Sequence, residues 1–139
     1  MTGSKEPLLD FEVSGRVTVA TIRTSSVLSA TNVADFGAEL VDYVGKHPGV
    51  ALIINFEHVD YLSSAVLTEL LRINKVINEV KGRLHLCAVS KTIREIFTIT
   101  NLDRVFVLHE DSKEAGVRRM ERSLAVAASE AAWEEPKSS

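Results

Sequence analysis

The sequence predicts an α/β fold, in which a mixed, mostly parallel sheet of four to five strands is covered by helices. The alternation of two kinds of segment predicts it. Short apolar runs of strand length alternate with segments whose apolar residues recur at helical spacing. Strands that alternate with helices pair at least partly in parallel, through right-handed crossovers. The expected order is β-β-α-β-α-β-α-β, followed by a C-terminal helix.

The first elements form a hairpin and a helix. Residues 8–14 and 17–24 have strand character, and Ser14-Gly15-Arg16 supplies the turn between them. Apolar residues at helical spacing predict a helix over 31–46. The next run, 50–56, is almost continuously apolar, which predicts a central strand with both faces covered.

The later elements follow the same alternation. Val66, Leu67, Leu70, Leu71, Ile73, Ile77 and Val80 trace the apolar side of a helix, which we expect to end with Gly82 as its C′ residue. We predict a strand over 83–89, a short helix over 90–98 capped by Ser90, and a last strand over 104–108.

Residues 112–132 predict a C-terminal helix, followed by a frayed end. Val117, Met120, Leu124 and Ala127 would lay its first half on the domain, and Trp133 is a further candidate anchor. A solvated helix that packs only in its first turns is favoured over a dedicated partner site. We expect one domain over 8–120 and a helical extension over 121–139.

Composition excludes several classes of function. The chain has 139 residues and a formal net charge of −3 without long single-sign runs, so nucleic acid is not an expected partner. No segment approaches the ~18 consecutive apolar residues of a membrane span. Cys87 is the only cysteine and is expected to be a small core residue. We expect a cytoplasmic protein that does not act on membranes.

Sequence signatures of catalysis and cofactor binding are absent. There is no Gly-rich phosphate loop and no Gly-x-Ser-x-Gly elbow. The histidines stand far apart in the sequence, so a metal site is not expected, although distant residues can converge in the fold. They are His47, His58, His85 and His109.

Two serines, Ser63 and Ser64, stand directly before the second helix. Either one can simply cap the helix, which contributes about 1 kcal/mol. The functional interpretation is that one of them accepts a phosphoryl group. The free N–H groups and the dipole of the helix would tolerate the added anion, while a partner docked there would not.

A family resemblance is carried by three stretches, 52–65, 82–90 and 93–106. Through these stretches, residues 8–120 resemble the STAS domain of bacterial anti-sigma factor antagonists. The resemblance implies a non-catalytic switch that binds an anti-sigma factor of the serine-kinase type, and a PP2C-type phosphatase as second partner. It places the phosphoacceptor on Ser63, with Ser64 as the alternate acceptor and the helix cap. No cofactor is implied.

The chain departs from the family pattern at three positions. Leu62 and Ser29 stand where relatives have aspartate, and Ala65 stands where they have glycine. The expected contact surface also takes in the exposed face of the helix, although a solvated face with a Glu69–Arg72 pair would explain those residues equally well. The surface comprises Tyr61, Leu62, Ser63, Ser64, Ala65, Thr68, Glu69, Arg72 and Ser29.

Two other functions stay open on the sequence. One is a constitutive scaffold or regulatory module that uses the same fold without phosphorylation, which the three departures favour. The other is a small enzyme with a site built from Ser63, His58 and Asp60, for which no oxyanion site or substrate pocket is indicated.

Overall fold

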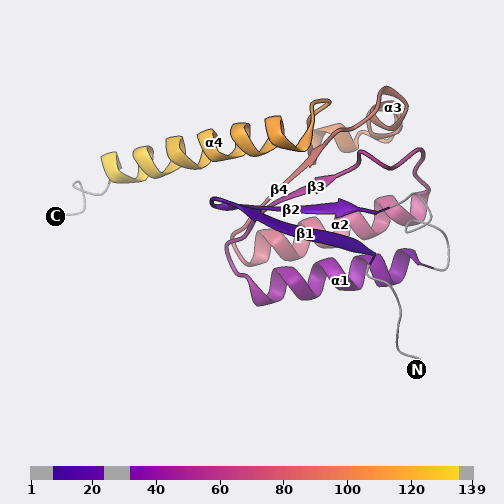
Figure 1. The fold of residues 1–139 in the computed structure, drawn as a ribbon, viewed down its shortest axis with the longest axis horizontal. Coiled ribbons are helices and arrows are strands. Elements are labelled where there is room, and N and C mark those ends of the chain that lie inside the picture. The colour runs from indigo at the N-terminus through magenta and orange to yellow at the C-terminus, as the bar shows by residue number, and fades with distance from the viewer. Residues whose placement is uncertain (1–7, 24–31, 135–139) are drawn as a thin grey trace.

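The computed structural model describes residues 8–23 and 32–134, with side chains as far as residue 129. It confirms the predicted order of strands and helices (Figure 1). The last predicted strand is shorter than 104–108, because the chain first turns through a 3-10 helix. The elements are β1 (Leu9–Ser14), β2 (Val17–Ile22), α1 (Val33–Lys46), β3 (Ala51–Asn55), α2 (Ser64–Glu79), β4 (Arg83–Cys87), α3 (Lys91–Ile99), η2 (Leu102–Arg104), β5 (Val107–Leu108) and α4 (Lys113–Glu134).

The sheet has the strand order β1-β2-β3-β4-β5. The hairpin strand β1 is antiparallel to β2, and the remaining neighbours are parallel. Every residue of β3 is buried. The prediction that this run forms the centre of the sheet, with both faces covered, is therefore confirmed.

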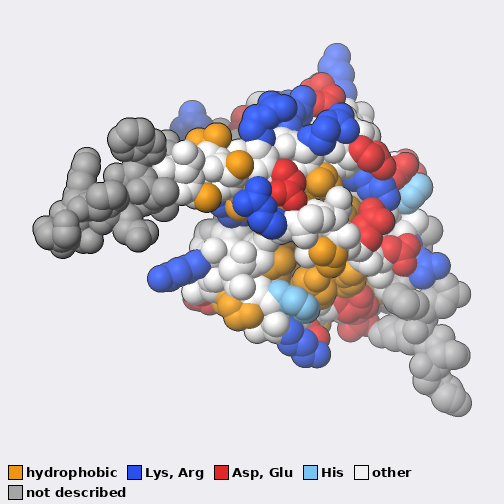
Figure 2. Space-filling model, turned by 60° about the vertical axis from the view of Figure 1, so that its left-hand side comes forward, with side chains coloured by type: hydrophobic (Ala, Val, Ile, Leu, Met, Phe, Trp, Pro, Cys, Tyr) orange, Lys and Arg blue, Asp and Glu red, His pale blue; other side chains and the backbone are white. Residues whose placement is uncertain are grey.

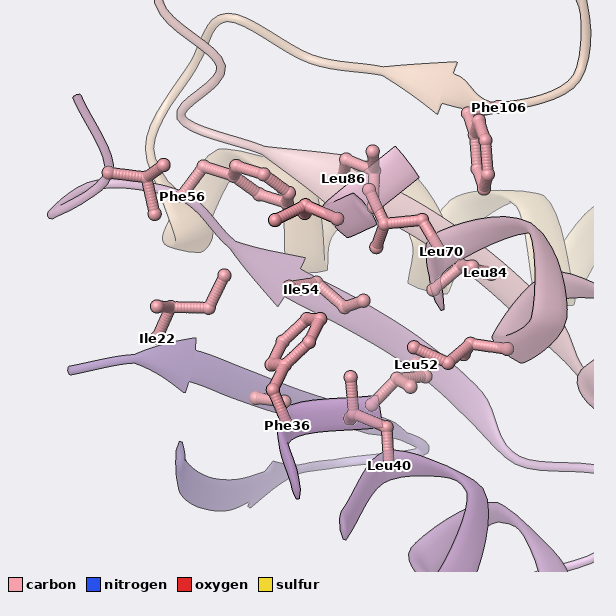
Figure 3. Packing of buried hydrophobic residues seen from close by; sticks show 14 of the residues in the cluster. Ile22, Phe36, Leu40, Leu52, Ile54, Phe56, Leu70, Leu84, Leu86 and Phe106 are labelled. Carbon is pink, nitrogen blue, oxygen red and sulfur yellow. The ribbon is translucent and has the colours of Figure 1, made fainter. Parts of the chain in front are cut away.

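The two faces of the sheet are covered by different helices. Helices α1 and α2 lie on one face and α4 on the other (Figure 1). Side chains alternate along a strand, so Leu52 and Ile54 of β3 enter the main core under α1 and α2 (Figure 3), whereas Ala51 and Ile53 face α4. A small cluster forms on the α4 face, from Val17, Val19, Ala51, Ile53, Cys87 and Met120.

Helix α4 packs on the sheet through its first half, as predicted. Met120 is fully buried, and Val117 and Leu124 pack against the small cluster. Gly116 permits the close approach, because a Cβ there would lie 3.2 Å from Cys87 Cβ. The C-terminal part of α4 extends past the sheet (Figure 1). The side chain of Trp133 lies outside the described residues.

The end of α2 differs from the prediction. The residue with positive φ is Lys81, at 62°, and not Gly82. Lys81 N–H donates to Asn78 O and Gly82 N–H donates to Ile77 O, which completes a Schellman motif. Glycine is required at 82 for a different reason, since a Cβ there would lie 2.5 Å from Val50 O.

Candidate functional site

Asn55, the last residue of β3, determines how the chain leaves the sheet. Its side chain is buried, and its Oδ1 accepts a hydrogen bond from Glu57 N–H at 3.1 Å. Its Nδ2 donates to Thr21 Oγ1 at 3.2 Å and to Glu57 Oε1 at 3.1 Å. A buried amide satisfied in this way fixes the local backbone. Asn55 thereby positions the loop that leads to Ser63.

Apolar side chains hold the loop between β3 and α2 onto the domain. Phe56 and Val59 are buried, and Leu62 is half-buried against the main core. Tyr61 points outward and is 56% exposed. Leu62 therefore serves as an apolar anchor of the loop and not as a polar contact.

Ser63 is the N-cap of α2. Its backbone is extended, with φ −103° and ψ 167°, and its Oγ accepts a hydrogen bond from Val66 N–H at 3.4 Å. Ser64 is the first residue inside the helix, so the expectation that Ser64 is the cap is wrong. Both side chains are exposed. A capping hydroxyl on the surface remains accessible to another protein.

The exposed side of α2 continues the surface that begins at Ser63. Ala65, Thr68 and Arg72 are exposed, and Thr68 Oγ1 donates to Ser64 O at 3.1 Å. Leu71, which the sequence pattern placed on the buried side, is 39% exposed. Its spacing from Ser64 and Thr68 could have revealed this, because residues seven and three apart share one side of a helix.

Glu69 is not part of a solvated face, although its pair with Arg72 is present. The Glu69 side chain is only 20% exposed, and its Oε1 lies 3.2 Å from Arg72 Nε. This buried oxygen has no well-aligned hydrogen-bond donor among the described residues. Glu69 packs against Gly37 of α1, where a Cβ would collide with the carboxylate. Glu69 thus joins the two helices beneath the surface.

Together the exposed residues form one surface, which we call the Ser63 surface: Tyr61, Ser63, Ser64, Ala65, Thr68, Leu71 and Arg72. Two cavities, of about 790 and 470 Å³, are lined by other parts of the molecule. A surface that lines none of these cavities and exposes Tyr61 and Leu71 suits a protein partner better than a small substrate. Ser29, which the sequence added to this surface, lies outside the described residues.

The fold brings together two histidines that the sequence separates. His109 Nδ1 lies 3.2 Å from Arg119 Nη1, and His109 Nε2 lies 3.1 Å from His85 Nδ1. Arg119 can only donate, so His109 Nδ1 accepts and its Nε2–H donates to His85. No sequence signal predicts this contact, because it depends on the register in which β5 pairs with β4.

Burial favours the neutral form of both imidazoles. Burial, followed by His109 and Arg83, lowers the pKa of His85 to about 4. Burial, followed by Arg119, lowers the pKa of His109.

The expectation that Cys87 is a core residue is confirmed, and burial raises its pKa to about 12. Within residues 8–23 and 32–134, no cluster of three or more potential ligands could hold a metal ion.

Comparison with known proteins decides the family. The model of the STAS domain matches residues 9–115. The chain belongs to the STAS domain family. This STAS domain is 30% identical over 98 residues to BtrV of Bordetella bronchiseptica, whose naming as an anti-sigma factor antagonist is provisional, and the match covers 70% of the chain and 83% of BtrV.

Solved STAS domain structures share the fold. One is the anti-sigma factor antagonist domain protein of Planctomyces limnophilus, with a TM-score of 0.67 and 23% identity, covering 77% of this chain and 93% of that one. Another is the Bacillus cell fate determinant SpoIIAA in its phosphorylated form, with a TM-score of 0.62 and 20% identity, covering 81% and 98%. In the described part of this STAS domain protein, no helix is both long and apolar enough to cross a membrane.

Proposed function

We propose that this STAS domain protein is a non-catalytic anti-sigma factor antagonist. It binds an anti-sigma factor of the serine-kinase type through the Ser63 surface and is released when that kinase phosphorylates Ser63; a PP2C-type phosphatase restores the binding form. The observation that carries the proposal is the position of Ser63, exposed at the start of α2 beside the exposed side chains of Tyr61 and Leu71. The name given to BtrV and the phosphorylated form of SpoIIAA support it.

The fold would tolerate a phosphoryl group at Ser63. The group adds about −1.5 to −2 charges at pH 7. At this position the anion lies beside the free N–H groups and the positive dipole end of α2, which favour negative charge. The first turn of α2 contains no acidic residue that would repel it. Phosphorylation is therefore expected to leave the domain folded.

A bound partner would respond differently. Tyr61 and Leu71 expose apolar area on the Ser63 surface, and a partner that covers them removes water from Ser63 as well. An uncompensated charge in such an interface costs several kcal/mol. Phosphorylation would thus switch binding through electrostatics while the folded state is preserved.

A second candidate function is a regulatory interaction module without phosphorylation. Leu62 favours it, because this side chain packs against the main core and offers a kinase no carboxylate. In that case Ser63→Ala and Ser63→Asp would behave alike in binding and in cells.

An esterase-like enzyme is the weaker alternative. Ser63 Oγ accepts the hydrogen bond that caps α2, and His58 Nε2 lies 3.9 Å from Glu57 Oε1. None of the four described cavities is lined by a residue of the Ser63 surface, so none offers an acyl substrate pocket there. Hydrolysis of an ester panel that disappears in Ser63→Ala would support this alternative.

The first experiment is mass spectrometry of the protein isolated from its native host under phosphatase inhibition. We expect one added phosphoryl group that maps to Ser63 and is lost in Ser63→Ala. Ser90→Ala is the matched control, because Ser90 caps α3 in the same way, accepting from Ile93 N–H at 3.2 Å. An unmodified mass in every growth condition would contradict the phosphorylation step and favour the regulatory module.

The second experiment measures binding to the host's anti-sigma kinase by calorimetry. Ser63→Asp is expected to weaken binding by roughly a hundredfold or more, which corresponds to about 2.7 kcal/mol. Ser90→Asp carries the same charge at the start of α3 and should bind like the unaltered protein. Equal affinity of Ser63→Asp and the unaltered protein would rule out the electrostatic switch.

A further inference from the structure

A second candidate binding site lies on the opposite face of the sheet, where α4 passes the start of β4. It is a cavity of about 450 Å³, lined by Arg83, Arg119, Arg122, Ser123, Val126 and Ala127. Among these lining residues every charged side chain is an arginine, and the remainder of the wall is a hydroxyl and small apolar groups. We call this cavity the arginine pocket.

Two of the three guanidinium groups are held in place by neighbours. Arg83 Nη1 donates to Ser123 Oγ at 2.9 Å, which joins β4 to α4. Arg119 forms an ion pair with Asp111 and contacts His109. Arg122 has no hydrogen bond or ion pair with any residue in the part of the chain that the structure describes. The pocket therefore combines oriented donors with one uncommitted cation.

No acidic side chain lines the pocket. Asp111 compensates Arg119, but the acidic side chains of α4 that the structure describes are engaged elsewhere. Arg16 holds Glu121 through two hydrogen bonds to its carboxylate, at 2.7 and 2.9 Å, and Glu114 lines a different cavity. Gathering like charges costs Coulomb energy unless an anion joins them. In a chain of net charge −3, such a cluster is a local exception.

The shape and chemistry of the pocket indicate which anion fits. A guanidinium group donates two parallel hydrogen bonds to phosphate oxygens and matches their geometry. Val126, which is 52% exposed, and Ala127 give the pocket an apolar wall beside the arginines. Figure 2 shows blue side chains on both sides of the helix that leads to the grey C-terminal residues, and orange side chains along it.

We propose that the arginine pocket binds a small phosphate monoester. Its phosphate group lies between Arg83 and Arg122, and its apolar substituent lies against Val126 and Ala127. The volume of about 450 Å³ accommodates a phosphate with a substituent of one or two rings. The oriented Arg83 lowers the entropy cost of binding, because Ser123 already restricts its side chain.

This site is separate from the Ser63 surface. Arg83 begins β4 at the amino edge of the parallel strands, whereas Ser63 follows the carboxyl end of β3. The pocket also lies on the α4 face, and α2 covers the other face (Figure 1). Loss of binding at one site therefore does not imply loss at the other.

The test is a titration of the ¹⁵N-labelled full chain with phenyl phosphate at pH 7.5 and constant ionic strength. We expect saturable shifts confined to the start of β4 and to α4, weakened at least roughly tenfold in Arg122→Ala. Arg118→Ala is the matched control, since Arg118 is also an exposed arginine of α4 but lines a different cavity. It should bind within about twofold of the unaltered protein.

Three outcomes would overturn the proposal. One is the absence of saturable shifts, and another is equal weakening in Arg122→Ala and Arg118→Ala, which would show general charge attraction. The third is binding to vesicles containing phosphatidic acid without binding to phenyl phosphate, which would identify a lipid surface as the ligand. Saturable binding of phenyl phosphate with weaker binding of inorganic phosphate would support the role of the apolar wall.

Discussion

On one face of the sheet, α1 and α2 bury a continuous apolar core, whereas on the other face α4 alone packs on a small cluster bordered by polar groups. Phe36, Leu40 and Leu70 are fully buried in the main core. Beside the small cluster lie His85, His109 and Arg83. Burial of apolar area dominates folding free energy, so the first face stabilises the domain and the second has room for charged and titratable groups.

The largest effect should come from the main core. Phe36→Ala removes a fully buried aromatic ring between α1 and the sheet. We expect it to lower the free energy of unfolding by about 3–5 kcal/mol. Urea denaturation followed by circular dichroism measures the loss. A cost below about 1 kcal/mol would show that the core can collapse around the cavity.

A comparable substitution to alanine on the α4 face should lower the free energy of unfolding by a smaller amount. Met120 is fully buried, but only a single helix holds it there. We expect Met120→Ala to lower the free energy of unfolding by about 2 kcal/mol and to speed amide hydrogen exchange in α4 more than in α2. If Met120→Ala costs as much as Phe36→Ala in the same urea series, the two faces do not differ in the way we describe.

Acidification should act on the α4 face. Burial lowers the pKa of His85 from its ordinary value of 6.5 to about 4 in the folded protein, so the unfolded chain binds more protons between these values. The free energy of unfolding is therefore highest above about pH 6.5 and decreases as the pH falls toward 4. Neighbouring charges also act on the two histidines. Arg83 opposes a positive charge on His85. Arg119 and Arg94 oppose a positive charge on His109, and Asp111 favours it.

The pH series is measured as unfolding by urea at fixed ionic strength. His85→Gln, which stays neutral, should flatten the decline between pH 6.5 and 4. His58→Gln is the control, because His58 is exposed and lies outside the pair. If the free energy of unfolding of His85→Gln declines as steeply as that of the unaltered protein, the histidine pair does not cause the decline.

Truncation should have the smallest effect. A chain that ends at residue 128 keeps Met120 and Leu124, so its free energy of unfolding should stay within about 0.5 kcal/mol of the full chain. The boundary expected after residue 120 falls inside α4, and a chain that ends there loses Leu124. We expect that shorter chain to be less stable by about 1 kcal/mol, measured by thermal unfolding.

The sequence predicts the elements of this fold well, because each leaves a local pattern. The apolar run of β3 and the spacing along α2 determine which side chains are buried, with Leu71 as the exception. Local backbone angles decide finer features: Ser63 is the cap because its backbone is extended, and Lys81 takes the left-handed conformation before Gly82. The turn at Lys81 and Gly82 also depends on the close approach of Gly82 to Val50, which residue type alone does not encode.

Contacts between distant segments could not be predicted from the sequence. The His85–His109 contact depends on the register between β4 and β5, and the packing of Glu69 on Gly37 depends on how α1 lies on α2. The arginine pocket likewise requires Arg83 to meet a helix that begins thirty residues later. Net charge, which averages over the whole chain, conceals a cluster of this kind.

The two edges of the sheet influence how the protein can associate. β5 has only two residues, and β1 presents the exposed carboxylates of Asp10 and Glu12 along the other edge. Short and charged edge strands discourage the addition of a further strand from another chain. Polymerisation through the sheet is thereby disfavoured.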